Sequence, residues 1–113
     1  MKIELLYFKT CPSYELALER LRRVLHRQKI DAQVEMVEVD SAEDARQLCF
    51  LGSPSIRING LDVEHGARSR TDWGLMCRMY DTGSALEGSP SEEMITSALL
   101  EALNADSQAP GAE

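Results

Sequence analysis

The chain has 113 residues, of which 43% are hydrophobic and 27% are charged, and its formal net charge is −7. This length and composition predict one globular domain with a single core. The acidic balance argues against nucleic acid or an anionic membrane as a partner, because either would require a basic face. No stretch approaches the roughly 20 apolar residues of a membrane span. The first residues lack the pattern of a signal peptide, so we expect a cytoplasmic protein.

The first half of the chain predicts strands that alternate with helices. In chain order these are a strand over 3–8, a helix over 15–28, a strand over 34–39, a helix from 41 to about 50, and a strand over 55–58. Ser41 has the residue type of an N-cap, and Asn59-Gly60 is a strong turn signal. The β-α-β-α-β order predicts a mostly parallel sheet with right-handed crossovers.

The second half of the chain is more irregular. Residues 61–71 predict a long polar loop, and loops of this length without their own structure are often functional. Residues 73–80 predict a fourth strand, antiparallel to the third, and residues 81–87 a further loop. Ser89-Pro90-Ser91-Glu92 predicts the start of a third helix, with a capping box and a proline at the first helical position. The domain is expected over 1–103, with 104–113 as a disordered tail.

Cys11 lies where the first strand turns into the first helix. The unpaired N–H groups at a helix N-terminus favour negative charge, and therefore favour the thiolate form of a cysteine placed there. Pro12 fixes a backbone angle suited to a first helical turn. Thr10 and Ser13 are polar neighbours of Cys11. We predict that Cys11 is a nucleophile. The competing interpretation is a small apolar residue at the end of a strand.

The other candidate ligands and thiols give weaker signals. Three cysteines are too few for a disulfide scaffold. Cys49 adjoins Leu48 and Phe50, which predicts a buried and inert thiol. His65 has no cysteine or histidine at ligand spacing, which argues against a zinc site. We therefore expect no metal and no other cofactor.

Two motifs resemble the thioredoxin superfamily. One is Phe8-Lys9-Thr10-Cys11-Pro12-Ser13-Tyr14 at the strand-to-helix turn, and the other is Gly52-Ser53-Pro54-Ser55-Ile56-Arg57-Ile58-Asn59-Gly60 around the third strand. The resemblance implies an α/β fold of order β-α-β-α-β-β-α, with a central mixed four-stranded sheet and helices on both faces. It also implies a cis Pro54 facing Cys11, with the backbone of Ser53 free to pair with a bound peptide or thiol ligand.

Tyr14 stands where that family has its second cysteine, so a Cys-x-x-Cys disulfide is impossible here. The chain resembles a monothiol member, in which a mixed disulfide is resolved by another thiol. The expected partners are therefore protein thiols or small-molecule thiols such as glutathione. The segment Leu75-Met76-Cys77-Arg78-Met79-Tyr80 resembles small bacterial thioredoxin-like proteins, some of which carry an alkylmercury-lyase label. True alkylmercury lyases use two cysteines and an acid on a different, larger fold, and this sequence does not show that arrangement.

The sequence leaves three functions open. The first is a monothiol oxidoreductase, and the second is a module that captures a soft metal such as mercury, copper(I) or zinc between Cys11 and Cys77. The third is a redox-inactive interaction protein. An antiparallel fourth strand would return Cys77 toward Cys11, as a resolving thiol or second ligand, or would bury it as an ordinary strand residue. Arg78 on the same rim would stabilise a thiolate or hold a carboxylate of glutathione. The expected catalytic residues are Cys11 and Cys77, and the expected substrate-binding residues are Thr10, Pro12, Ser13, Tyr14, Ser53, Pro54 and Arg78.

Overall fold

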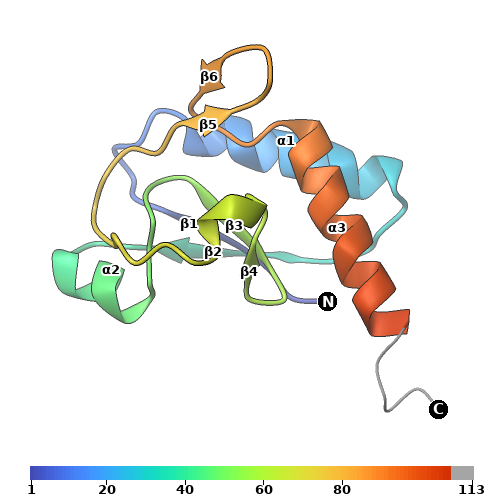
Figure 1. Cartoon of the computed structure of the whole chain (residues 1–113), viewed down its shortest axis with the longest axis horizontal. Helices are drawn as coiled ribbons and strands as arrows, with labels where there is room; N and C mark the ends of the chain where they lie inside the picture. The colour runs from blue at the N-terminus through green and yellow to red at the C-terminus, as the bar shows by residue number, and fades with distance from the viewer. Residues whose placement is uncertain (108–113) are drawn as a thin grey trace.

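The computed structural model describes residues 1–107, which form an α/β arrangement with a four-stranded mixed sheet and three α-helices (Figure 1). The sheet strands are β1 (Ile3–Tyr7), β2 (Val34–Glu38), β3 (Ser55–Ile58) and β4 (Leu61–Asp62). The helices are α1 (Tyr14–Arg27), α2 (Ala42–Gln47) and α3 (Glu92–Ser107), with a 3₁₀ turn η1 (His65–Ala67) and a small hairpin of β5 (Tyr80–Asp81) and β6 (Leu86–Glu87). None of the described helices is long and apolar enough to cross a membrane.

The strands of the main sheet lie in the order β2-β1-β3-β4. β1 pairs with β2 in parallel and with β3 in antiparallel, so that Leu5 has Met36 on one side and Ile56 on the other. The prediction of a mostly parallel sheet is therefore wrong, because β3 enters the sheet in the opposite direction. The turn predicted at Asn59-Gly60 is confirmed: both residues have positive φ, 52° and 82°, and they close the β3–β4 hairpin.

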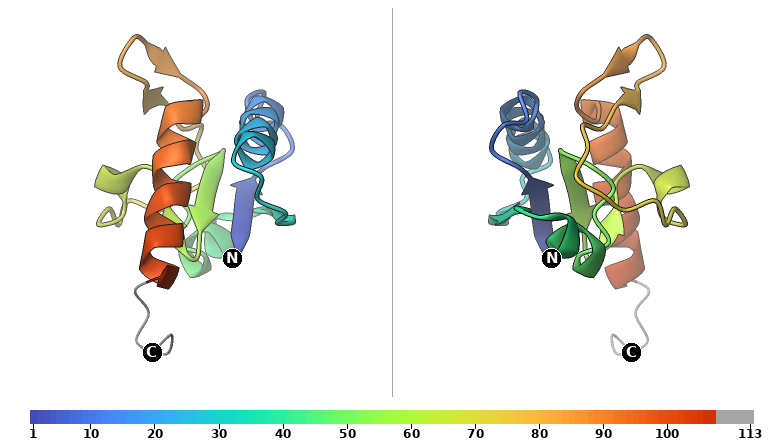
Figure 2. Two further views of the ribbon diagram at one scale, coloured as in Figure 1. Left: turned by 90° about the vertical axis from the view of Figure 1, so that its right-hand side faces the viewer. Right: turned by 90° about the vertical axis from the view of Figure 1, so that its left-hand side faces the viewer.

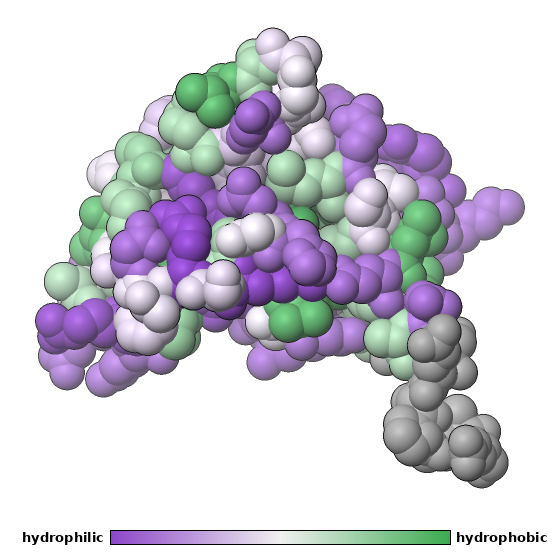
Figure 3. All heavy atoms as spheres, in the orientation of Figure 1, coloured by the Kyte–Doolittle hydropathy of each residue, from purple (hydrophilic) through white to green (hydrophobic). Residues whose placement is uncertain are grey.

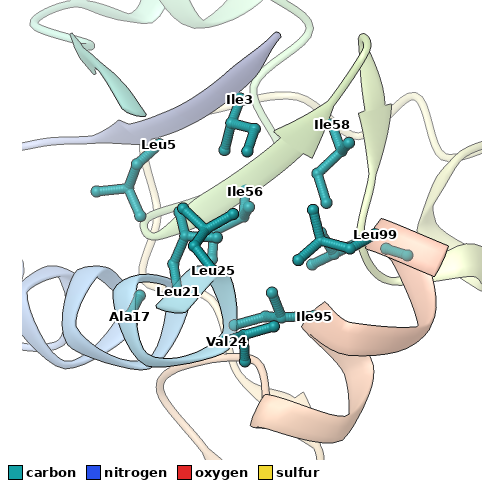
Figure 4. Packing of buried hydrophobic residues seen from close by; sticks show 12 residues of the cluster. Ile3, Leu5, Ala17, Leu21, Val24, Leu25, Ile56, Ile58, Ile95 and Leu99 are labelled. Atoms are coloured by element: carbon teal, nitrogen blue, oxygen red, sulfur yellow. The ribbon is translucent and has the colours of Figure 1, made fainter. Parts of the chain in front are cut away.

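The main core lies between one face of the sheet and the helices α1 and α3. Alternate residues along a strand point to the same face, so Ile3 and Leu5 of β1 join Ile56 and Ile58 of β3. Figure 4 shows these side chains meeting Leu21, Val24 and Leu25 of α1 and Ile95 and Leu99 of α3. Each such side chain stabilises the fold by roughly 1.5–3 kcal/mol when fully buried.

A smaller cluster covers the opposite face of the sheet, where Leu6 of β1 packs with Val39, Ala45 and Phe50. α1 and α3 thus pack on one face of the sheet and the short α2 on the other. The side views in Figure 2 show α1 at the upper end of the strands and α2 at their lower end. The predicted cap at Ser41 is confirmed, because its Oγ accepts a hydrogen bond of 3.0 Å from the Asp44 N–H. α2 ends at Gln47 and is shorter than predicted.

The second half of the chain departs most from the prediction. Residues 73–80 do not form an antiparallel fourth strand. That position in the sheet belongs to β4, inside the predicted loop over 61–71, because the tight Asn59-Gly60 turn returns the chain at once. The predicted loop over 81–87 contains the β5–β6 hairpin. α3 begins at Glu92, after its cap Ser91, whose Oγ accepts a hydrogen bond from the Met94 N–H. The prediction of Pro90 at the first helical position is therefore wrong, because Pro90 precedes that cap.

The boundary of the predicted tail also moves. α3 continues through Ser107, so residues 104–107 are helical rather than disordered. The remainder of the predicted tail, 108–113, lies outside the described residues.

Candidate functional site

Cys11 lies in the turn between β1 and α1. Its backbone N–H donates to the Phe8 carbonyl at 3.0 Å, which closes the turn. Thr10 and Pro12 on either side are exposed, whereas Cys11 itself is only 3% exposed. The N-cap of α1 is Ser13, whose side chain makes no capping hydrogen bond. The thiol is therefore next to the first turn of the helix, but it faces inward.

Tyr14 opens α1 and stacks on Tyr7, the last residue of β1, with the ring centroids 4.6 Å apart. Both rings pack against the main core and are partly buried. Tyr14 therefore joins the end of the strand to the start of the helix around the Cys11 turn.

The Ser53–Pro54 segment reaches the same turn. The Ser53–Pro54 peptide bond is cis, as predicted, and both residues are buried. The Oγ of Ser53 accepts a hydrogen bond of 3.3 Å from the Phe8 N–H. Because Phe8 also holds the Cys11 N–H, Ser53 and Cys11 are linked through a single residue. This hydrogen bond brings the Ser53–Pro54 segment next to the turn that holds Cys11.

The backbone of Ser53 is not free, contrary to the expectation from the sequence. Its N–H donates to the Met76 carbonyl at 2.8 Å, and its carbonyl accepts from the Arg78 N–H at 3.0 Å. These two bonds form a parallel bridge between Ser53 and Cys77. We call residues 74–79 the strap, because they run along this edge outside the main sheet; Figure 1 shows their path up to β5.

The side chain of Cys77 is exposed, so the interpretation of this residue as a buried strand residue is wrong. A parallel bridge, rather than an antiparallel strand, fixes its position. The structure brings Cys77 next to Ser53, which contacts the Cys11 turn.

Arg78 anchors the strap, with a side chain that is only 2% exposed. Its guanidinium donates to both oxygens of Asp62, at 2.7 and 2.9 Å, to Glu64 at 2.8 Å and to Ser55 at 2.9 Å. It also lies 4.4 Å from the centroid of the Tyr80 ring. These donors are therefore committed to the protein's own groups, which differs from the predicted role of binding a thiol ligand. The Arg78 Nε is buried without a partner among the described residues.

The electrostatics of this cluster follow from its burial. Burial alone would lower the pKa of Arg78, but the hydrogen bonds and negative charge of Asp62 and Glu64 outweigh it and leave that pKa above its usual value. Burial raises the pKa of Tyr80, whose hydroxyl donates to the Pro54 carbonyl at 2.5 Å. The arginine is therefore charged and the tyrosine neutral at physiological pH. The strap is held at Ser53, and Tyr80, which follows it, is held at Pro54.

Two glycines permit close contacts around this site. Gly52 has φ of +115°, and a Cβ built there would lie 3.0 Å from the Cβ of Arg78. A Cβ built on Gly88 would clash with the Oγ of Ser13. The segment before α3 therefore abuts Ser13, whereas the strap abuts Gly52.

A groove of about 400 Å³ runs beside the Cys11 turn. Phe8, Lys9 and Thr10 form one side, the end of β2 another, and Leu75 of the strap a third. Lys9 and Glu38 form an exposed ion pair of 3.8 Å at its edge. The groove offers a place for an extended ligand next to the turn that holds Cys11.

The prediction that Cys49 is buried is wrong, because its side chain is exposed. α2 ends before it, and Cys49 has a positive φ of 54° that turns it away from the apolar cluster. Sequence reasoning also missed Asp62, Glu64 and Tyr80, because nothing local in the sequence shows that a loop acid and a distant arginine will meet.

Comparisons of the chain with family models, with curated proteins and with solved structures found no match. Within residues 1–107, the structure contains no group of three or more histidine, cysteine or acidic side chains placed to hold a metal ion. The functional argument therefore starts from the two cysteines, Cys11 and Cys77, and from Ser53 between them.

Proposed function

We propose that the chain is a monothiol thioredoxin-like protein that carries out thiol–disulfide exchange, with Cys11 as the nucleophile and Cys77 as the resolving thiol. The observation that carries this proposal is the position of Ser53, whose Oγ bonds the Cys11 turn and whose backbone bonds both neighbours of Cys77. The order of strands and helices up to β4, followed by α3, agrees with the thioredoxin-like arrangement that the two motifs suggest. Free thiols suit the reducing cytoplasm as its location.

The exchange has two steps. The thiolate of Cys11 attacks one sulfur of a substrate disulfide, a new S–S bond forms, and the other substrate sulfur leaves as a thiolate that takes a proton from solvent. The thiolate of Cys77 then attacks the Cys11 sulfur, which forms a Cys11–Cys77 disulfide and releases the first substrate sulfur. The substrate disulfide gains two electrons and the protein loses two. A thiol such as glutathione returns these electrons, two molecules becoming one glutathione disulfide.

Access to Cys11 requires a movement, because its side chain is 3% exposed. The strap closes one side of the groove beside the turn, through Leu75, and holds Ser53 by two hydrogen bonds. Its Arg78 end is fixed by a buried ion pair. The other end has the exposed side chains of Leu75 and Cys77 and is held by backbone hydrogen bonds, among them one of 2.9 Å from the Gly74 N–H to the Phe50 carbonyl. We therefore expect the Gly74–Cys77 end to move away first, and the exchange to be limited by that opening.

The test uses glutathione disulfide on the folded chain, followed by peptide mapping without reduction. The background is Cys49→Ser, which removes the exposed thiol that the proposal does not use. We expect a Cys11–Cys77 disulfide in this background, and a stable Cys11–glutathione adduct once Cys77→Ser is added.

A chain carrying Cys49→Ser and Cys77→Ser in which Cys11 reacts in urea but never in the folded state would overturn the proposal. That result would make Cys11 an ordinary core residue. A Cys11→Ser variant serves as the control, because adducts found there on Cys77 alone measure the background reactivity of an exposed thiol.

A further inference from the structure

A second pocket, distant from Cys11 in the sequence, lies between the end of α2, the β3–β4 hairpin and the loop after η1. Its volume is about 390 Å³, which is within the range of small-molecule sites. Leu48 and Leu51 form an apolar part of its wall, and Trp73 contributes an aromatic ring that is 39% exposed. The pocket therefore offers both a flat apolar surface and an open entrance.

The charged groups in this wall are mostly positive, although the chain as a whole is acidic. Three arginines line the pocket, Arg57, Arg68 and Arg70, together with one carboxylate, Asp62. Both oxygens of Asp62 accept hydrogen bonds from Arg78 outside the wall. In Figure 3, hydrophilic residues predominate across the middle of the face shown, over η1 and the loop that follows it.

The carboxylates that pair with two of these arginines do not line the pocket. Arg68 donates to Glu101 at 2.7 and 2.8 Å, and Arg70 donates to Asp72 at 2.6 and 2.9 Å. Arg68 and Arg70 therefore line the pocket as members of ion pairs whose acidic partners lie outside its lining.

Arg57 differs from the other two arginines, because no carboxylate within residues 1–107 pairs with it. One of its terminal nitrogens, Nη2, donates to the carbonyls of Leu48 and Cys49, at 2.7 and 2.8 Å. Its Nε and Nη1 have no hydrogen-bond partner among the described residues. Glu4, directly across the sheet from Arg57, forms an ion pair with Lys2 at 3.8 Å instead. The backbone carbonyls thus hold the guanidinium in place, with donors left for a ligand.

We propose that this pocket binds a small organic anion, with a carboxylate or phosphate held by Arg57 and Arg70 and an apolar or aromatic body lying against Trp73. An anion supplies the acceptors that the free donors of Arg57 lack, and a charge-assisted hydrogen bond is stronger than a neutral one. The loop over 61–73 then acts as one wall of a binding site.

The probes are phenylacetate, phenyl phosphate and the neutral phenylacetamide, each added to the intact chain. Trp73 is the only tryptophan in the sequence, so its fluorescence reports on this pocket alone. We expect a saturable fluorescence change with at least one anion, and binding of phenylacetamide that is weaker by about tenfold or more, since the amide cannot form the charged pair. Added salt should weaken the binding of the two anions and leave the binding of phenylacetamide unchanged. The tighter of the two anions identifies a carboxylate or a phosphate as the natural group.

The variants separate a specific site from the general field of the protein. Arg57→Gln should weaken anion binding about tenfold, since it removes a charged donor. Arg46→Gln removes the same charge from an exposed position on α2 outside the pocket, and should leave the affinity unchanged. Because Arg57 also holds the end of α2, circular dichroism must show an intact fold. Arg70→Gln is the second variant, since its exposed ion pair contributes little to stability.

Three results would overturn the proposal. The first is equal binding of phenylacetamide and the anions, which would make the pocket a purely apolar surface. The second is an equal loss of affinity in Arg46→Gln and in the pocket variants. The third is the absence of a saturable signal with both anions.

Discussion

Arg78 and Asp62 form an ion pair that lies almost entirely inside the protein, with side chains that are 2% and 7% exposed. A charge removed from water is costly unless a partner and further hydrogen bonds compensate for it. Here Asp62 supplies both of its oxygens, and Glu64 and Ser55 supply two further acceptors. The pair therefore makes the position of the strap conditional on a few specific groups.

Asp62→Asn should destabilise the fold strongly, because Arg78 keeps its charge in the interior while it loses its main counter-ion. We expect a loss of about 3 kcal/mol in the free energy of unfolding, measured by urea denaturation. Asp72→Asn is the matched control, since it breaks an arginine pair on the surface. Its midpoint should stay close to that of the original chain, and an equal shift in both variants would contradict the role assigned to burial.

The β5–β6 hairpin is the element held most clearly by surface charge. Arg20 of α1 donates to Glu87 at 2.7 Å and to the Pro90 carbonyl at 3.1 Å, and Thr82 donates to Glu87 at 2.9 Å. The hydrogen bonds from Arg20 and then Thr82 hold the pKa of Glu87 below its usual value. The hairpin is thus joined to α1 through an acid that titrates at low pH.

The sign of the pH effect follows from that lowered pKa. The unfolded chain binds a proton at Glu87 more readily than the folded chain does, so the stabilisation is present above about pH 4.3 and is lost as the pH falls through the folded pKa. The stability of Glu87→Gln should therefore decline less than that of the original chain between neutral and acid pH. Chemical denaturation at each pH measures this decline. The same decline in both chains would show that Glu87 does not couple the hairpin to α1.

The sequence predicted the elements whose pattern is local, and missed those fixed by distant contacts. The strand over 55–58 and the Asn59-Gly60 turn are confirmed, because alternation and positive φ are properties of neighbouring residues. The strap was predicted as a strand, because residues 73–80 are apolar enough to be one. Its actual position depends on Asp62 and Ser53, which its own sequence does not reveal. The exposure of Cys49 was missed for a similar reason, since α2 ends a turn early.

At the scale of the whole molecule, the main core joins both halves of the chain. β1 and α1 come from the first thirty residues, and α3 comes from the last described segment, yet their side chains form one cluster (Figure 4). Trp73 lines a pocket together with Leu48, which packs against the smaller cluster on the other face of the sheet. If the chain is a single cooperative unit, the main core and the pocket with Trp73 should unfold in the same transition.

Leu99→Ala tests this cooperation, because Leu99 is fully buried where α3 meets the sheet. We expect it to destabilise the chain by about 3 kcal/mol through lost contacts and a residual cavity. Circular dichroism, which reports on the helices, and Trp73 fluorescence should give the same midpoint. Leu100→Ala, which alters the exposed neighbour on the same helix, should have little effect. Separate midpoints for the two signals would show two independent units.

The bridge between Ser53 and Cys77 has a consequence for the newly made chain. A ribosome releases the Cys11 turn first and Ser53 next, and it releases Met76 and Arg78 only later. During that interval the backbone N–H and carbonyl of Ser53 lack the partners that the strap provides. Asp62 and Glu64 likewise lack Arg78. α3, which completes the main core, is made later still, so we expect the strap to pair with Ser53 only when the whole chain folds together.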